Sequence, residues 1–143
     1  MGFFIMTSKD YQLKFEAFLC RNKFDFIFHN KFLFAKESDI IACKDMELYE
    51  YEFKIGESDF RKDIKKERHI DGCPNYFFYV VPDLNIINGD YYDYAGIYLH
   101  KFDKRGDSSF KLIKPPEKIR DCFITLDESY KLLTKIYNGK TIY

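Results

Sequence analysis

The sequence predicts an α/β domain in which helices flank a mixed β-sheet. Two groups of short segments rich in Ile, Tyr and Phe have the composition of strands. A charged segment separates the two groups, and amphipathic segments precede the first and follow the second. The expected element order is therefore αβββαβββα, which suits a mixed sheet with flanking helices. We expect residues 1–143 to form a single domain, because this length allows one proper core.

The first helix is indicated by Thr7 and Asp10, which have the spacing of a capping box. An apolar stripe then continues to Asn22 at helical spacing, and we expect it to face the core. The stripe consists of Tyr11, Phe15, Phe18 and Leu19.

Alternating phenylalanines after this helix predict a β-hairpin. We interpret residues 29–31 as its turn. The alternating residues are Phe24, Phe26 and Phe28 before the turn, and Phe32 and Phe34 after it.

The next two strands are expected at residues 39–43 and 46–55, joined by a two-residue turn at residues 44–45. This turn would pair Cys43 with Met46. The register matters because it decides which charged side chains of the two strands meet.

In this register Asp39 lies opposite Glu50. Because strand side chains alternate with period 2, Glu52 and Lys54 share that face. Glu52 is then the diagonal neighbour of Asp39, at roughly 7–8 Å, so one cation can sit between them. Mg²⁺ takes oxygen ligands, which Asp39, Glu52 and the backbone carbonyl of Phe53 would supply. An ion here would activate a water against a phosphate, and Lys54 would stabilise the charge that develops. The alternative is an ordinary solvated strand face.

A charged helix is predicted over residues 59–69, with Ser58 as its N-cap and Asp59 in its first turn. Its cations suit a nucleic-acid backbone, and a plain solvated helix is the alternative. The basic residues are Arg61, Lys62, Lys65, Lys66 and Arg68, of which the first four are the candidate contacts to DNA.

The second group of strands follows this helix. The apolar run 76–81 predicts a central buried strand that ends at Pro82, and residues 83–93 form a polar loop. Residues 95–100 and 110–113 predict two more strands, with a turn at Gly106. A last helix is indicated by an apolar stripe that stops at Gly139. Its members are Leu126, Tyr130, Leu133, Ile136 and Tyr137.

Taken in order, these motifs resemble the MmcB-like DNA-repair family of the PD-(D/E)XK nuclease-like superfamily. The resemblance covers residues 38–113. Ser38 stands where the superfamily usually has Pro, and Glu50 where an apolar residue is more usual. The matching motifs are Glu52-Phe53-Lys54-Ile55, Ser58-Asp59-Phe60, Asp63, Lys65-Lys66, the aromatic run from Asn75 to Pro82, and Ala95-Gly96-Ile97-Tyr98.

The resemblance implies a restriction-endonuclease-like fold, dependence on Mg²⁺ (or Mn²⁺) and a nucleic-acid substrate. It places Asp39, Glu52 and Lys54 in the core of the site. Further candidates beside it are Glu16 on the first helix, Glu50, Ser58, Asp59 and Asp63.

Composition limits the remaining possibilities. The net charge is zero, so a surface that binds DNA must be local. The four cysteines and three histidines are dispersed, which argues against zinc and for free thiols in a reducing, cytoplasmic setting. The apolar start is too short for a membrane span.

Two classes of function follow. One is a Mg²⁺-dependent deoxyribonuclease of DNA repair, recombination or mobile elements, which would cut both strands as a homodimer. The other is a catalytically silent protein of the same fold that binds nucleic acid or a protein.

Overall fold

The fold is built on a six-stranded mixed β-sheet, in a computed structural model that describes residues 7–34, 36–64, 68–69, 72–89, 91–137 and 140–142. The strands lie in chain order, and β3–β4 and β4–β5 are the parallel pairs. The predicted α/β class is confirmed. The strands are β1 (Phe26–Phe32), β2 (Glu37–Lys44), β3 (Glu47–Phe53), β4 (Tyr76–Val81), β5 (Gly96–Phe102) and β6 (Ser108–Lys114).

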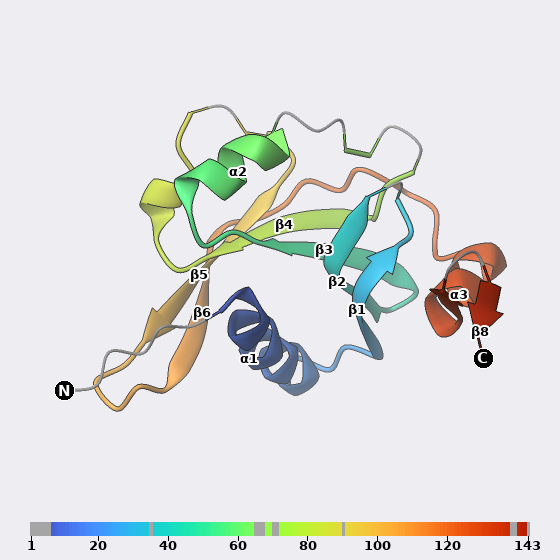
Figure 1. Ribbon diagram of the computed structural model, residues 1–143, viewed down its shortest axis with the longest axis horizontal. Coiled ribbons are helices and arrows are strands. Elements are labelled where there is room, and N and C mark those ends of the chain that lie inside the picture. Colours follow the sequence, from blue (N-terminus) through green and yellow to red (C-terminus); the bar gives the residue numbers. More distant parts are fainter. Residues whose placement is uncertain are drawn as a thin grey trace.

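The described residues form three α-helices: α1 (Ser8–Arg21), α2 (Glu57–Ile64) and α3 (Leu126–Leu133). Helices α1 and α2 cover opposite faces of the sheet, and α3 lies beside β1 and β2 (Figure 1). The 3₁₀ turn η1 (Leu84–Ile86) lies within the expected polar loop. In the parallel β3–α2–β4 crossover, the end of β3 lies close to the start of α2. The candidate site residues Glu52, Lys54 and Asp59 lie at this junction.

Helix α1 forms as the sequence predicts. The hydroxyl of Thr7 accepts from the Asp10 backbone N–H at 3.3 Å, and the Asp10 carboxylate accepts from the Thr7 N–H at 2.9 Å. This capping box satisfies two backbone donors at the helix start. Phe15 and Leu19 are fully buried against the sheet, where the ring of Phe15 packs 4.7 Å from Tyr51. The amphipathic stripe therefore anchors α1.

The hairpin expected around residues 29–31 is wrong, because β1 runs unbroken through those residues. Asn30 does adopt a left-handed backbone (φ 54°), a conformation that Asn favours in turns, which is why residues 29–31 resemble a turn in the sequence. However, His29 pairs with Ile40 and Lys31 with Ser38 on either side of it, so the chain continues along β2 instead of reversing.

The turn between β2 and β3 lies one residue later than expected. Lys44 pairs with Glu47, so the two-residue loop is Asp45 and Met46. Both have positive φ (52° and 67°), as a type I′ hairpin turn requires. Asp tolerates that conformation better than most residues, which favours this loop over one that includes Lys44.

The register is corrected accordingly. Cys43 pairs with Leu48 and not with Met46, a shift of two residues. Because side chains alternate with period 2, an even shift leaves each of them on the face that the sequence predicted. Continuing the ladder sets Asp39 directly opposite Glu52 instead of diagonal to it.

Two predicted helices have different bounds in the structure. Helix α2 begins at Glu57, before the expected N-cap Ser58, and the backbone at Arg68 is not helical. Helix α3 ends at Leu133, and the backbone of Thr134 is extended (φ −104°, ψ 148°). Lys65, Lys66 and Gly139 lie outside the described residues.

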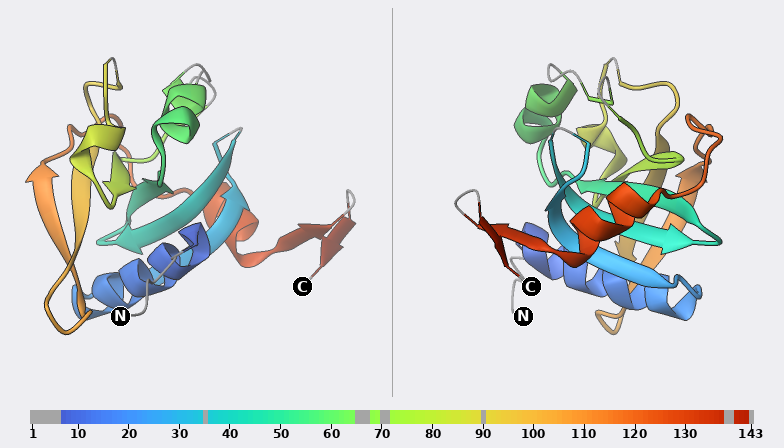
Figure 2. Two further views of the ribbon diagram at one scale, coloured as in Figure 1. Left: turned by 60° about the vertical axis from the view of Figure 1, so that its left-hand side comes forward. Right: turned by 90° about the vertical axis from the view of Figure 1, so that its right-hand side faces the viewer.

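The stripe residues Ile136 and Tyr137 belong to β7 (Lys135–Tyr137), which pairs with β8 (Lys140–Ile142). A β-branched and aromatic run favours strand over helix, so this part of the predicted helix is wrong. Figure 2 shows the β7–β8 hairpin projecting away from the sheet.

Two further expectations about secondary structure agree with the structure. Strand β4 matches the expected central strand, and the turn before β6 holds Gly106 at φ 81°. All four cysteines are unpaired. No helix among the described residues is long and apolar enough to cross a membrane.

His100 on β5 makes fold stability depend on pH. Its ring is buried between Tyr11, Phe102 and Phe110, with centroids 4.5–4.8 Å away. Neither ring nitrogen has a hydrogen-bond partner among the described residues. Burial, followed by the charge of Lys14, lowers its pKa from 6.5 to about 4. Between these values the unfolded chain binds the extra proton, so stability is lost as the pH falls through 6.5.

We expect His100→Leu to remove this loss. The free energy of unfolding of the wild type should fall, relative to the variant, by up to about 3 kcal/mol between pH 7 and pH 4. Urea denaturation at both pH values measures it. Phe102→Leu, which changes a neighbouring ring that does not titrate, should shift stability equally at both. Parallel pH profiles for wild type and His100→Leu would contradict the prediction.

Candidate functional site

Five charged side chains are buried between the sheet and α2, and we call them the charge cluster. Glu50 and Glu52 belong to β3, Lys54 follows that strand, Asp63 lies on α2 and Arg68 follows α2. Each is at most 8% exposed. Taking an ion out of water costs several kcal/mol unless charged partners and hydrogen bonds replace the solvent. The ion pairs and hydrogen bonds inside the cluster therefore determine whether the folded state is stable with these charges buried.

Arg68 lies at the centre and contacts all three carboxylates. Its Nε and Nη2 donate to Asp63 Oδ1 at 2.9 and 2.6 Å. Its Nη1 donates to Glu50 Oε2 at 3.4 Å, and Nη2 lies 3.3 Å from Glu52 Oε2. One guanidinium thus connects β3 to α2.

The pKa values of the cluster reflect this contact. Burial opposes the charged form of Arg68, but Glu52, Asp63 and Glu50 raise its pKa above the usual value, so it stays protonated. Burial alone would raise the pKa of Asp63. The hydrogen bonds and charge of Arg68, with Lys54 and the Tyr79 hydroxyl, hold that pKa below its usual range.

Lys54 is the second buried cation. Its Nζ lies 3.4 Å from Asp63 Oδ1, 3.7 Å from Asp59 Oδ1 and 3.8 Å from Glu52 Oε2. Asp59 lies in the first turn of α2 with its side chain half exposed, so it forms the solvent side of this group. The ammonium of Lys54 therefore lies beside Glu52 and below the start of α2, as the sequence predicted for a lysine on that strand face.

Asp39 and Glu52 meet where β2 and β3 begin to separate. The Asp39 N–H donates to Glu52 Oε1 at 3.3 Å, and Asp39 Oδ2 accepts from the Phe53 N–H at 2.9 Å. Burial, and next the adjacent Asp39 carboxylate, raises the pKa of Glu52 well above its usual value. Burial also raises the pKa of Asp39. The two carboxylates therefore lie close together in a largely buried site. Asp39 is partly exposed, so solvent reaches the site on its side.

Glu50 belongs to a branch of the cluster that extends away from Lys54. Its Oε2 accepts from the Ser38 hydroxyl, and its Oε1 lies 2.6 Å from His69 Nε2. Because an ionised carboxylate only accepts, Nε2 is the nitrogen that donates. His69 Nδ1 lies 2.7 Å from the Tyr94 hydroxyl. These two bonds hold His69 although its φ of 65° is uncommon for a residue with a side chain.

The remaining predicted residues lie around the cluster or away from it. Ser58, Arg61 and Lys62 are exposed on α2, and Arg61 pairs with Glu57 at 3.4 Å. Glu16 lies on α1, across the sheet from α2, and its Oε2 is 3.3 Å from Nε2 of His29 on β1. The proposed DNA contacts Lys65 and Lys66 lie outside the described residues.

The sequence reasoning missed part of the cluster. The sequence places Arg68 in an exposed basic helix, and the wide spacing of the three histidines gives no reason to single out His69. Tyr79 and Tyr94 carry no signal, and Ser38 is notable only as a departure from the superfamily pattern. Glu50 at a normally apolar strand position was the one available clue, because a buried carboxylate requires a cation and hydrogen-bond donors nearby.

The charge balance leaves room for a divalent cation. No three His, Cys, Asp or Glu side chains of the described ranges are placed to share an ion. Mg²⁺, however, keeps several waters and binds through one or two carboxylates. In and beside the cluster, five carboxylates outnumber two basic side chains. The carboxylates are Asp39, Glu50, Glu52, Asp59 and Asp63, and the basic side chains are Lys54 and Arg68.

The comparisons with known proteins bear on the fold. No protein-family model matches the chain, and no curated protein matches it. Among solved structures, a protein of unknown function from Silicibacter pomeroyi is similar, with a TM-score of 0.63 at 14% sequence identity. The match covers 91% of this chain and 84% of that one. At such low identity the likeness shows a shared fold and carries no chemistry.

Arg68→Met should destabilise the protein strongly. The substitution leaves three buried carboxylates without their shared cation, and we expect the free energy of unfolding to fall by about 3–5 kcal/mol. Arg61→Met is the matched control, because Arg61 is exposed and its single ion pair contributes less than about 0.5 kcal/mol. Urea denaturation at neutral pH compares the two. Equal losses for both variants would show that Arg68 has no special role.

Proposed function

We propose that this protein is a Mg²⁺- or Mn²⁺-dependent nuclease that cleaves DNA phosphodiester bonds, with a PD-(D/E)XK-type fold and site. DNA repair, recombination or mobile-element biology is its proposed setting, and the MmcB-like family its proposed relation. The observation that carries the proposal is the meeting of Asp39 and Glu52, with Lys54 3.8 Å from Glu52 on the same side of the sheet.

The donor set fits a hard cation. Asp39 and Glu52 offer carboxylate oxygens. Burial raises the pKa of both, and the charge of Asp39 raises that of Glu52 further, so a cation beside them would favour their ionised forms. In an extended strand the N–H and C=O of one residue point to the same side. The Phe53 N–H points to Asp39, so its carbonyl faces the same side and supplies a third oxygen. When bound, the ion would polarise the scissile phosphate and acidify a water.

The surrounding residues have roles that follow from their charge. Lys54 would stabilise negative charge as it grows on the phosphate oxygens, because its ammonium is held in place before the reaction. Asp59 and Asp63 position that ammonium through their contacts with it. The exposed Arg61 and Lys62 on α2, with Lys65 and Lys66, would contact the DNA backbone.

A second candidate function rests on Arg68. Its guanidinium lies 3.3 Å from Glu52, which a catalytic cation would also need. This contact supports a catalytically silent protein whose charge cluster is structural and which binds nucleic acid or a protein. The two candidates differ in whether Asp39 and Glu52 bind a metal ion and whether Lys54 affects a rate.

Metal affinity tests the shared site. We expect Asp39→Asn to weaken Mn²⁺ binding at least about tenfold, because changes merely in the surroundings of a metal site already cost 10–100-fold. The variant should fold, since an Asn oxygen still accepts from the Phe53 N–H. Asp45→Asn is the control, with the same loss of charge at the turn end of the same hairpin. Calorimetric titration measures both, and equal affinity in wild type and Asp39→Asn would exclude the site.

Lys54→Ala separates the two functions. In a nuclease it should lower the rate of DNA cleavage about 10²-fold or more, the scale for losing one preorganised electrostatic group. Metal affinity should change little, because Asp39 and Glu52 remain, and Lys54→Arg should retain more of the rate. Single-turnover assays with Mg²⁺ and Mn²⁺ on single-stranded, duplex and branched DNA measure it. A wild type that binds DNA but cleaves none of these substrates would support the silent protein.

A further inference from the structure

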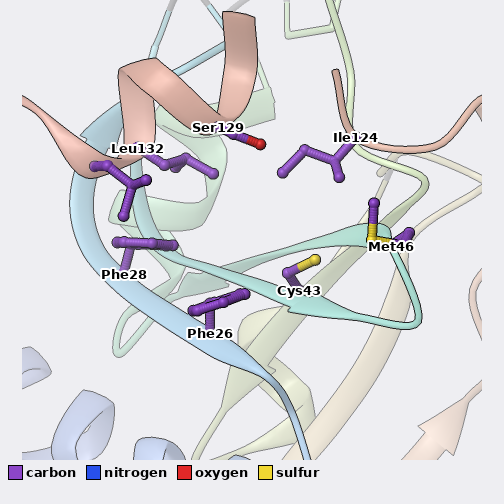
Figure 3. Close-up of a pocket in the computed structure, with 8 residues that line it drawn as sticks. Phe26, Phe28, Cys43, Met46, Ile124, Ser129 and Leu132 are labelled. Carbon is purple, nitrogen blue, oxygen red and sulfur yellow. The ribbon is translucent and has the colours of Figure 1, made fainter. Parts of the chain in front are cut away.

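An apolar pocket of about 270 Å³ lies between α3 and the β1–β2 side of the sheet. Figure 3 shows Phe26 and Phe28 on one side, with Leu132 and Ser129 of α3 opposite them. Cys43 and Met46 close the end near the β2–β3 turn. The pocket is separate from the charge cluster, with which it shares no residue.

The surface around this pocket is unusually apolar. Phe26, Met46 and Leu133 line the pocket and are each more than half exposed, and Leu126 on α3 is 91% exposed. At roughly 200 Å² for a fully exposed side chain of this size, the four expose on the order of 550 Å². Stable interfaces bury roughly 800 Å² per partner, so these side chains would supply about two thirds of one.

The exposed face of α3 is self-complementary. Leu126 and Leu133 are seven residues apart, two helical turns, so they lie on one face while Leu132 packs against the sheet. Asp127 and Lys131 flank that face and form an exposed ion pair at 3.0 Å. If a second α3 packs antiparallel across a two-fold axis, Leu126 meets Leu133 twice, and Asp127 approaches Lys131 twice.

We propose that a second copy of this chain covers the α3 face and the adjoining pocket, forming an isologous dimer. The leucines bury their exposed surface, and the Asp127 and Lys131 charges of the two copies alternate along the contact. In an antiparallel pair the two-fold axis runs across the helices and brings Asp127 of one copy to Lys131 of the other, whereas an isologous parallel pair would place the two Asp127–Lys131 pairs on opposite sides of the contact. The proposal is independent of any catalytic activity of the charge cluster.

Sedimentation equilibrium of the full chain tests the dimer. We expect wild type to be dimeric at tens of micromolar and Leu126→Glu/Leu133→Glu to be monomeric with unchanged circular dichroism, since both side chains are exposed. Leu13→Glu, which changes an exposed leucine on α1, should remain dimeric. A monomeric wild type, or a double variant that still dimerises, would overturn the proposal.

Charge variants test the antiparallel geometry. Asp127→Lys and Lys131→Asp each create like-charge contacts in a homodimer, so each alone should dimerise about tenfold more weakly than wild type. An equimolar mixture of the two should recover the affinity as a heterodimer, in which every contact is again between opposite charges. The mixture contains the same two chains, so effects on each chain's own stability cancel. A mixture no tighter than its components would overturn the arrangement.

Discussion

Arg68 contacts all three carboxylates of the charge cluster. Its guanidinium reaches Glu50 and Glu52 on β3 and Asp63 on α2, so it bridges the sheet to the helix above it. A carboxylate buried without a cation would take up a proton or would destabilise the fold. Together with Lys54 and the buried ring of Phe60, a residue outside any helix or strand therefore fixes the position of α2.

Ser38 and Glu50, the two positions that differ from the PD-(D/E)XK pattern, contact each other in the structure. Ser38 and Glu50 are hydrogen-bonded across β2 and β3, and Glu50 is further satisfied by Arg68 and His69. A carboxylate at a normally apolar position is thus part of a connected network, in which each member supplies the donor or acceptor that another needs. Such networks fix one arrangement of the core, and a half-satisfied one would be worse than an apolar core.

Local patterns predicted what depends on local physics. The capping box at Thr7 and the apolar run of β4 gave elements of the right type in the right place. Asp39, Glu52 and Lys54 were brought together despite a register error, because an error of two residues does not change the face of a side chain. The position of the β2–β3 turn was wrong because it depends on which residues tolerate positive φ.

What the sequence could not show depends on contacts between distant segments. Arg68 follows a charged helix, and its local neighbours gave no sign that it is buried. His69 meets Glu50 nineteen positions away, a contact that only the fold creates. The helical period of the apolar stripe continues through Ile136 and Tyr137 although these two residues lie in a strand, because the backbone is extended at Thr134, directly after α3.

The β2–β3 hairpin relates the two proposals to each other. Asp39 and Glu52 lie at its open end, and Cys43 and Met46, at its turn, line the pocket beside α3. A second copy docked on α3 would therefore cover the turn end and leave the other end accessible. Duplex DNA and an isologous dimer each have a two-fold axis, so two copies related in this way present equivalent sites to the two antiparallel strands. A single copy of the site would face one strand at a time, so a nuclease that cuts both strands would need the pair of sites that a dimer through α3 provides.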